Sequence, residues 1–99
     1  MLNIEKYTKG SELTFRLAGR LDTVTSADLE KEVNTSLDGI TSLIMDFQDL
    51  EYISSAGLRV LISAQKIMNN AGSMKVIHVN EAIMEIFEVT GFADILTIE

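Results

Sequence analysis

A succession of two hydrophobic periods along the chain constrains the fold more than any other feature. In residues 12–17, ELTFRL, every second side chain is apolar, which predicts a half-exposed β-strand. In residues 25–38 apolar side chains recur every fourth position with charges between them, which predicts an amphipathic helix. The side chains placed toward a core are those of Leu13, Phe15, Leu17, Leu29, Val33 and Leu37. A chain that alternates these periods is expected to fold as an α/β protein.

The same reading along the chain predicts the order β-β-α-β-α-β-α-β. The predicted strands cover residues 2–7, 12–17, 42–47, 74–79 and 94–98, and the predicted helices begin near residues 25, 55 and 81 and end at Gly39, Gly72 and Gly91. The first two strands should form a hairpin that turns at Lys9 and Gly10, while helical crossovers join the later strands. We therefore expect one domain over residues 1–99, with a mixed β-sheet and about three helices.

Three local predictions accompany this order. Thr25 followed by Asp28 resembles a capping box that starts the first helix. The apolar run 42–47, SLIMDF, is typical of a central strand covered on both faces of the sheet. The segment 48–54, QDLEYIS, is expected to be a loop.

Composition excludes several classes of function. The chain has no Cys and one His, His78, so thiolate chemistry and a multi-histidine metal site are not expected. A net charge of −7 argues against binding to nucleic acid or to an anionic membrane. The start of the sequence lacks the apolar region of a signal peptide, and no apolar run approaches the length of a membrane span. We expect a cytoplasmic protein without metal or cofactor.

The segment 52–59, YISSAGLR, joins a strand pattern to a helix pattern. Either Ser54 or Ser55 is placed to cap the helix, which leaves the other hydroxyl without a structural task. On a helical projection the core face holds Ala56, Val60, Leu61, Ala64, Ile67, Met68 and Ala71, and the face toward water holds Arg59, Ser63, Lys66 and Asn70.

Leu58 and Ile62 fall outside both groups, in the sector of the Ser55 hydroxyl. Together with Arg59 they form either an aliphatic docking patch beside a serine or a surface that a neighbouring segment covers. A phosphate on Ser55 would add negative charge that the helix N-terminus tolerates, so it would block a partner without unfolding the domain. Gly57 leaves room for another chain to approach the helix start.

The segment DFQDLEYISSAGLRVLISAQKIM resembles the signature of STAS domains, the anti-sigma factor antagonist family. GRLDTVTSADLE, at residues 19–30, is similar to the family's Gly-x-Leu-Asp stretch before its first helix, and VNEAIMEIFEVTGFADIL, at 79–96, to its C-terminal part. The likeness covers nearly all of the chain, and the central motif is fairly specific.

The resemblance implies partner switching. The unphosphorylated protein would bind an anti-sigma factor that is also a serine kinase, and so free a sigma factor; a serine phosphatase would reset the switch. The phosphorylated serine of the family falls on Ser55. Many family members carry Asp at the preceding position, where this chain has a second hydroxyl, so Ser54 is the second choice. The residues expected to bind the partner are Asp22, Ser54, Ser55, Gly57, Leu58, Arg59 and Ile62.

Two other functions are compatible with parts of the sequence. A hydrolase would need Ser54 or Ser55 together with His78 and an aspartate such as Asp46, but ISSAG is no nucleophile elbow. No catalytic residue is therefore expected. STAS-like domains also serve as adaptor subunits of stress-sensing or transporter-associated complexes, where the same surface would hold a fixed partner without phosphorylation.

Overall fold

Four strands form one mixed sheet in the order β1-β2-β3-β4, and the computed structural model describes all residues from 1 to 99. The elements are β1 (Leu2–Lys9), β2 (Glu12–Leu21), α1 (Ser26–Ser36), β3 (Ser42–Ile53), α2 (Ser55–Ala71), β4 (Ser73–Ile77), α3 (Glu81–Thr90) and a 3-10 turn, η1 (Phe92–Asp94). β1 and β2 pair antiparallel as a hairpin, whereas β3 runs parallel to both β2 and β4. The predicted α/β class, mixed sheet, hairpin and three helices are all confirmed.

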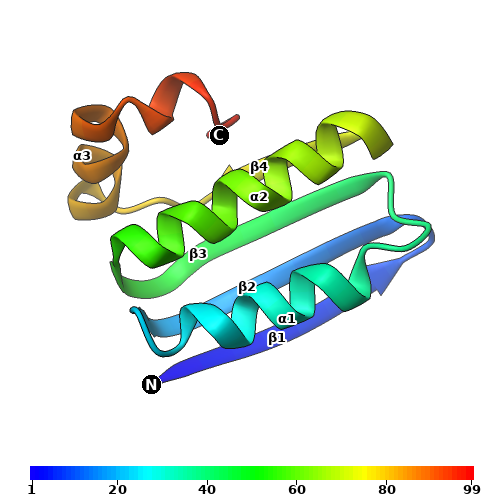
Figure 1. The fold of residues 1–99 in the computed structure, drawn as a ribbon, viewed down its shortest axis with the longest axis horizontal. Helices are drawn as coiled ribbons and strands as arrows, with labels where there is room; N and C mark the ends of the chain where they lie inside the picture. Colours follow the sequence, from blue (N-terminus) through cyan, green and yellow to red (C-terminus); the bar gives the residue numbers. More distant parts are fainter.

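Helices α1 and α2 lie side by side across one face of the sheet (Figure 1). The apolar side chains that were expected to face a core are buried there: Leu13, Phe15, Leu17, Leu29, Val33 and Leu37. Burial of such side chains is the main favourable contribution to folding.

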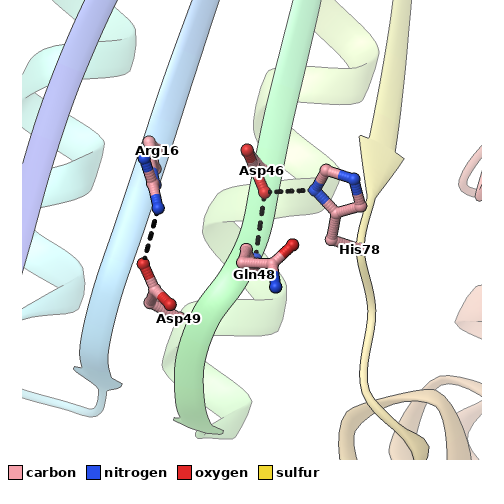
Figure 2. A network of polar contacts seen from close by, with 5 residues as sticks. All are labelled: Arg16, Asp46, Gln48, Asp49 and His78. Atoms are coloured by element: carbon pink, nitrogen blue, oxygen red, sulfur yellow. Dashed lines mark hydrogen bonds and ion pairs between the residues drawn. The ribbon is translucent and has the colours of Figure 1, made fainter.

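The opposite face of the sheet is not covered by α1 or α2. The prediction that residues 42–47 are covered on both faces is wrong, because Ile44 and Asp46 are only half-buried there. Figure 2 looks onto this open face, with the two helices behind the strands. The sequence suggested two covered faces because Ile44 is apolar, although its side chain faces outward from the helices.

The segment expected to be a loop, residues 48–54, is a strand up to Ile53. Two register shifts in the β2–β3 ladder insert extra residues into β3, so that Ala18 pairs with Asp49 and Arg20 with Tyr52. The buried positions of β3 therefore change from every second residue to every third, at Phe47, Leu50 and Ile53. Because β-bulges break the period of two, the sequence pattern of a strand is lost there.

The end of the chain also differs from its prediction. Residues 94–98 make a single parallel bridge, between Val76 and Ile98, in place of a regular strand. Val76 N donates to Thr97 O at 2.8 Å and Glu99 N donates to Val76 O at 2.9 Å, so this tail covers the edge of β4. β4 itself ends at Ile77, because His78 adopts a positive φ of 58° that leaves the sheet.

Helix α2 begins and ends close to the predicted residues, and Gly72 follows its last residue. Val60, Leu61, Ala64 and Met68 are buried as expected, while Ile67 is 37% exposed and Ala71 is exposed. The expected polar face is confirmed, because Arg59, Ser63, Lys66 and Asn70 are all exposed.

Candidate functional site

The two serines of the central motif lie at the carboxyl end of β3, where α2 begins. Ser54 is the N-cap residue, and its Oγ accepts a hydrogen bond from Gly57 N at 3.2 Å. Its backbone N–H donates to Leu21 O at 2.8 Å, which ties the cap to the end of β2. Ser54 is half-buried, and its hydroxyl is engaged in holding the first turn of the helix.

Ser55 is the first residue of α2, and its environment is different. It is exposed, and its hydroxyl makes no hydrogen bond within the protein. Of the two hydroxyls left open by the sequence, only that of Ser55 is therefore both accessible and unengaged. The pair consists of one cap and one free hydroxyl.

Gly57 is buried where α2 crosses the ends of β2 and β3. A β-carbon at this position would lie 2.8 Å from Leu21 Cγ and 2.9 Å from Ile53 Cγ1. The expectation that Gly57 leaves room for another chain is wrong, because the protein's own strand ends fill this space. Its contribution to the site is to let the helix start approach the sheet closely.

The aliphatic patch that was considered for Leu58 and Ile62 is not present. Leu58 is 5% exposed and belongs to the hydrophobic core, and Ile62 is half-buried and packs against that core. Gln65, in the same sector of α2, is 7% exposed. The helix therefore buries a wider arc than its apolar spacing indicates. Of the two alternatives for Leu58, burial by neighbouring segments is correct and an open docking patch is wrong.

Asp22 lies in the turn between β2 and α1. Its Oδ1 accepts hydrogen bonds from Val24 N at 3.1 Å and from Thr25 N at 2.9 Å. The Thr25 N–H is the largest cause that holds the pKa of the Asp22 carboxyl below its ordinary value, against an opposing effect of burial. The carboxyl therefore stabilises this turn. The turn is in contact with the Ser54 cap, because Leu21 O, just before it, accepts the hydrogen bond from Ser54 N.

The predicted capping box at Thr25 is wrong. The Thr25 side chain accepts no hydrogen bond from α1, and its hydroxyl donates to Arg20 O at 2.8 Å. The Ser26 hydroxyl likewise turns back to Asp22 O. Both hydroxyls therefore hold the turn to the end of β2. The N–H of Asp28, which a capping side chain would satisfy, donates instead to the backbone oxygen of Thr25 at 3.0 Å.

A groove of about 220 Å³ separates this turn and α1 from the first two turns of α2. Thr23, Ser26 and Glu30 line one side, and Ala56 and Arg59 line the other. The turn and the start of α2 lie together at one end of the molecule (Figure 1). We call this region, residues 20–25 with residues 52–59, the switch end.

Two exposed apolar side chains at the switch end were missed by the sequence reading. Val24 is 79% exposed and Tyr52 is 37% exposed, with the Arg20 guanidinium carbon 4.2 Å from the centroid of the Tyr52 ring. A valine within the polar run DTVTS was the available signal for the first. Tyr52 could not be placed, because the bulges of β3 decide which way it faces.

The aspartate and histidine of the rival hydrolase reading do pair, but away from the serines. His78 Nδ1 lies 2.8 Å from Asp46 Oδ1 on the open face of the sheet (Figure 2). Asp46 precedes Ser54 by eight residues along β3, which is a separation of roughly 20 Å once the two bulges are allowed for. The three groups therefore form no Ser-His-Asp constellation, which requires hydrogen-bond contact.

The Asp46 carboxylate instead supports the local fold. Its Oδ1 also accepts a hydrogen bond from Gln48 N at 3.0 Å, within the irregular stretch of β3. Burial is the largest single influence and acts to raise the pKa of Asp46, but the hydrogen bonds from His78 and Gln48, with nearby positive charge, hold that pKa below its ordinary value. Arg16 and Asp49 form a neighbouring ion pair at 3.0 Å.

No group of three or more His, Cys, Asp or Glu side chains is arranged to hold a metal ion. None of the helices has the length and apolar character needed to cross a membrane.

Comparison with known proteins gives a consistent result. The chain matches the STAS domain family over residues 3–99. It is 31% identical over 98 residues to the anti-sigma-B factor antagonist of Staphylococcus aureus, an alignment that covers 96% of this chain and 90% of that protein.

Solved structures of similar fold carry related names. An anti-sigma factor antagonist from Mycobacterium paratuberculosis superposes with a TM-score of 0.89 at 18% identity, covering 99% of this chain and 85% of that one. SpoIIAA, also an anti-sigma factor antagonist, superposes at 17% identity over the whole of this chain. The TM-score is 0.77 for its unphosphorylated form, 87% of which is covered, and 0.76 for its phosphorylated Bacillus form, 91% of which is covered.

Proposed function

This chain belongs to the STAS domain family, and we propose that it is an anti-sigma factor antagonist that works by phosphorylation-controlled partner switching. In the unphosphorylated form it binds an anti-sigma factor that is also a serine kinase, and a sigma factor is released. The single observation that carries the proposal is the exposed, unengaged hydroxyl of Ser55 beside the engaged hydroxyl of Ser54.

Phosphorylation of Ser55 ends the binding. The Ser55 Oγ attacks the γ-phosphorus of ATP held by the kinase, its proton passes to a base of the kinase, and ADP leaves. A serine phosphatase hydrolyses the phosphoester and restores the binding form. The protein itself is a binding module that acts in the cytoplasm and contributes no catalytic group.

The phosphate blocks the partner without unfolding the domain. It adds about −1.5 to −2 charge at the first turn of α2, where the helix dipole favours an anion. Ser54 remains free to cap the helix, since its Oγ is not the modified atom. A partner that must bury this surface then meets the cost of desolvating the phosphate and, where its own surface is acidic, charge repulsion.

The partner surface differs from the one first expected from sequence. With Leu58 in the core, the exposed apolar side chains of the switch end are those of Val24 and Tyr52, and Arg59 supplies an exposed positive charge. Gly57 and Asp22 act indirectly, since one allows close packing of the helix start and the other braces the adjoining turn. Aromatic and arginine side chains are enriched at protein–protein interfaces.

The names of the relatives support the proposal. The Staphylococcus aureus relative is an anti-sigma-B factor antagonist, and SpoIIAA has been solved both with and without its phosphate. The adaptor alternative keeps one observation in its favour. Ser54 occupies a position where many family members carry Asp, so a STAS subunit of a stress-sensing or transporter-associated complex could use this surface without phosphorylation.

Mass spectrometry after incubation with ATP and the anti-sigma-type kinase of the same genome tests the proposal. We expect one phosphoryl group on the peptide that contains Ser55 and none in the Ser55→Ala variant. Ser63→Ala is the matched control, because Ser63 is an exposed serine of the same helix, and it should accept phosphate like the wild type. A stable complex with the kinase and no phosphate on Ser55 would instead establish the adaptor role.

A further inference from the structure

We propose that Arg59 is the positioning residue of the switch, whose guanidinium holds the phosphoryl group of Ser55 against the first turn of α2. This rests on the proposed function, because it concerns the state that follows phosphorylation. It goes further by assigning to one named side chain the control of where the phosphate lies.

Arg59 is the one arginine of the chain that has no partner. The chain has three arginines. Arg16 forms an ion pair with Asp49 at 3.0 Å, and the Arg20 guanidinium carbon lies 4.2 Å from the centroid of the Tyr52 ring. Arg59 is exposed and forms no ion pair, although Glu30 lines the same groove. Its guanidinium is therefore available to an anion that reaches the switch end.

The helix places this cation beside Ser55. Residues 55 and 59 are separated by four positions, so they are neighbours on the surface of α2, with roughly 5–6 Å between their β-carbons. Long side chains of a helix lean toward its N-terminus, which directs Arg59 over the turn that carries Ser55. Ser55 in turn has no hydrogen bond that would have to break for its Oγ to carry a phosphate.

The surroundings leave few other groups that could neutralise the phosphate. The chain carries 15 acidic and 8 basic side chains, so a dianion is added to a surface that is already negative. Guanidinium binds phosphate through two parallel hydrogen bonds, which an ammonium group cannot do. Once it is held by the phosphate, Arg59 is also withdrawn from any carboxylate of the partner, so both effects weaken the complex.

The ionisation of the phosphate reports directly on this contact. Phosphoserine installed at position 55 during synthesis makes the test independent of whether any kinase recognises Ser55. Titration of its ³¹P chemical shift in the full chain gives the second pKa of the phosphate, which is ordinarily about 6. The same titration is carried out on the Arg59→Gln and Lys66→Gln variants.

We expect Arg59→Gln to raise this pKa by about 0.3 pH unit, the size of an exposed ion pair within a helix. Lys66 is an exposed cation on the same side of α2 three turns away, so Lys66→Gln should leave the value unchanged. Equal pKa values in wild type and Arg59→Gln, or equal shifts in the two variants, would overturn the proposal. Neither result bears on whether the kinase modifies Ser55, which the mass spectrometry decides separately.

Discussion

Polar side chains gather in two regions of this molecule, and the regions differ in how those side chains are satisfied. On the open face of the sheet, Arg16 pairs with Asp49 and Asp46 pairs with His78, so these polar side chains have partners within the protein (Figure 2). At the switch end, Ser55 and Arg59 are exposed and have no partner in the chain. The two regions therefore do not differ in their density of polar groups, but only the region of the proposed site leaves such groups unengaged beside a rigid turn.

The rigid turn is built from the same kinds of residue as the site itself. The side chains of Ser54, Asp22 and Thr25 form hydrogen bonds with backbone groups around them. Their engagement fixes the place of Ser55 while leaving its hydroxyl free. Three comparisons between variants test this difference between side chains that support the turn and side chains that are free to bind.

The largest effect is expected for Leu58→Ala, which removes a core side chain from beneath the switch end. The variant should lose roughly 2–4 kcal/mol of unfolding free energy, because the change leaves a cavity in a well-packed core. Urea denaturation measures this loss. Ile44→Ala, a half-buried aliphatic on the open face, is the control and should lose clearly less. Equal losses would mean that the two regions are supported by equally deep packing.

A smaller effect separates the two adjacent serines. Ser54→Ala should cost about 1 kcal/mol of stability, because the N–H of Gly57 loses its capping acceptor. Ser55→Ala should stay within about 0.5 kcal/mol of wild type, since that hydroxyl makes no bond. Thermal unfolding of both variants side by side gives the comparison. A larger loss for Ser55→Ala than for Ser54→Ala would reverse the roles assigned here.

The smallest effect concerns pH and the open face. The folded pKa of Asp46 lies below its unfolded value of about 3.9, so its contribution to stability is present above that pH and is lost as the pH falls further. We expect wild type to lose up to about 1 kcal/mol more than Asp46→Asn between pH 7 and pH 3. Urea midpoints at the two pH values give the difference.

Asp38→Asn is a suitable control for that measurement, because Asp38 is exposed and forms no ion pair. It should follow the wild-type pH dependence. If Asp46→Asn also follows wild type, the Asp46–His78 contact contributes nothing measurable to the folded state.

Periodicity alone located most of the sheet and all three helices, because Leu13, Phe15 and Leu17 or Leu29 and Val33 repeat at the spacing of their own element. It missed the second half of β3, since two register shifts against β2 change the spacing of the buried positions. It also misjudged Leu58, because the arc that α2 buries depends on what packs around the helix.

The sequence by itself determined the fold class, the position of a serine pair at a helix start and the resemblance that points to a partner switch. These are properties of local order along the chain, set by side-chain period and by capping chemistry. Only the tertiary structure decided which serine is the cap, that Gly57 serves internal packing, that Leu58 lies in the core, and that Val24 and Tyr52 are exposed. Those facts depend on how the ends of β2 and β3 meet α2, a meeting of segments about thirty residues apart that no local pattern encodes.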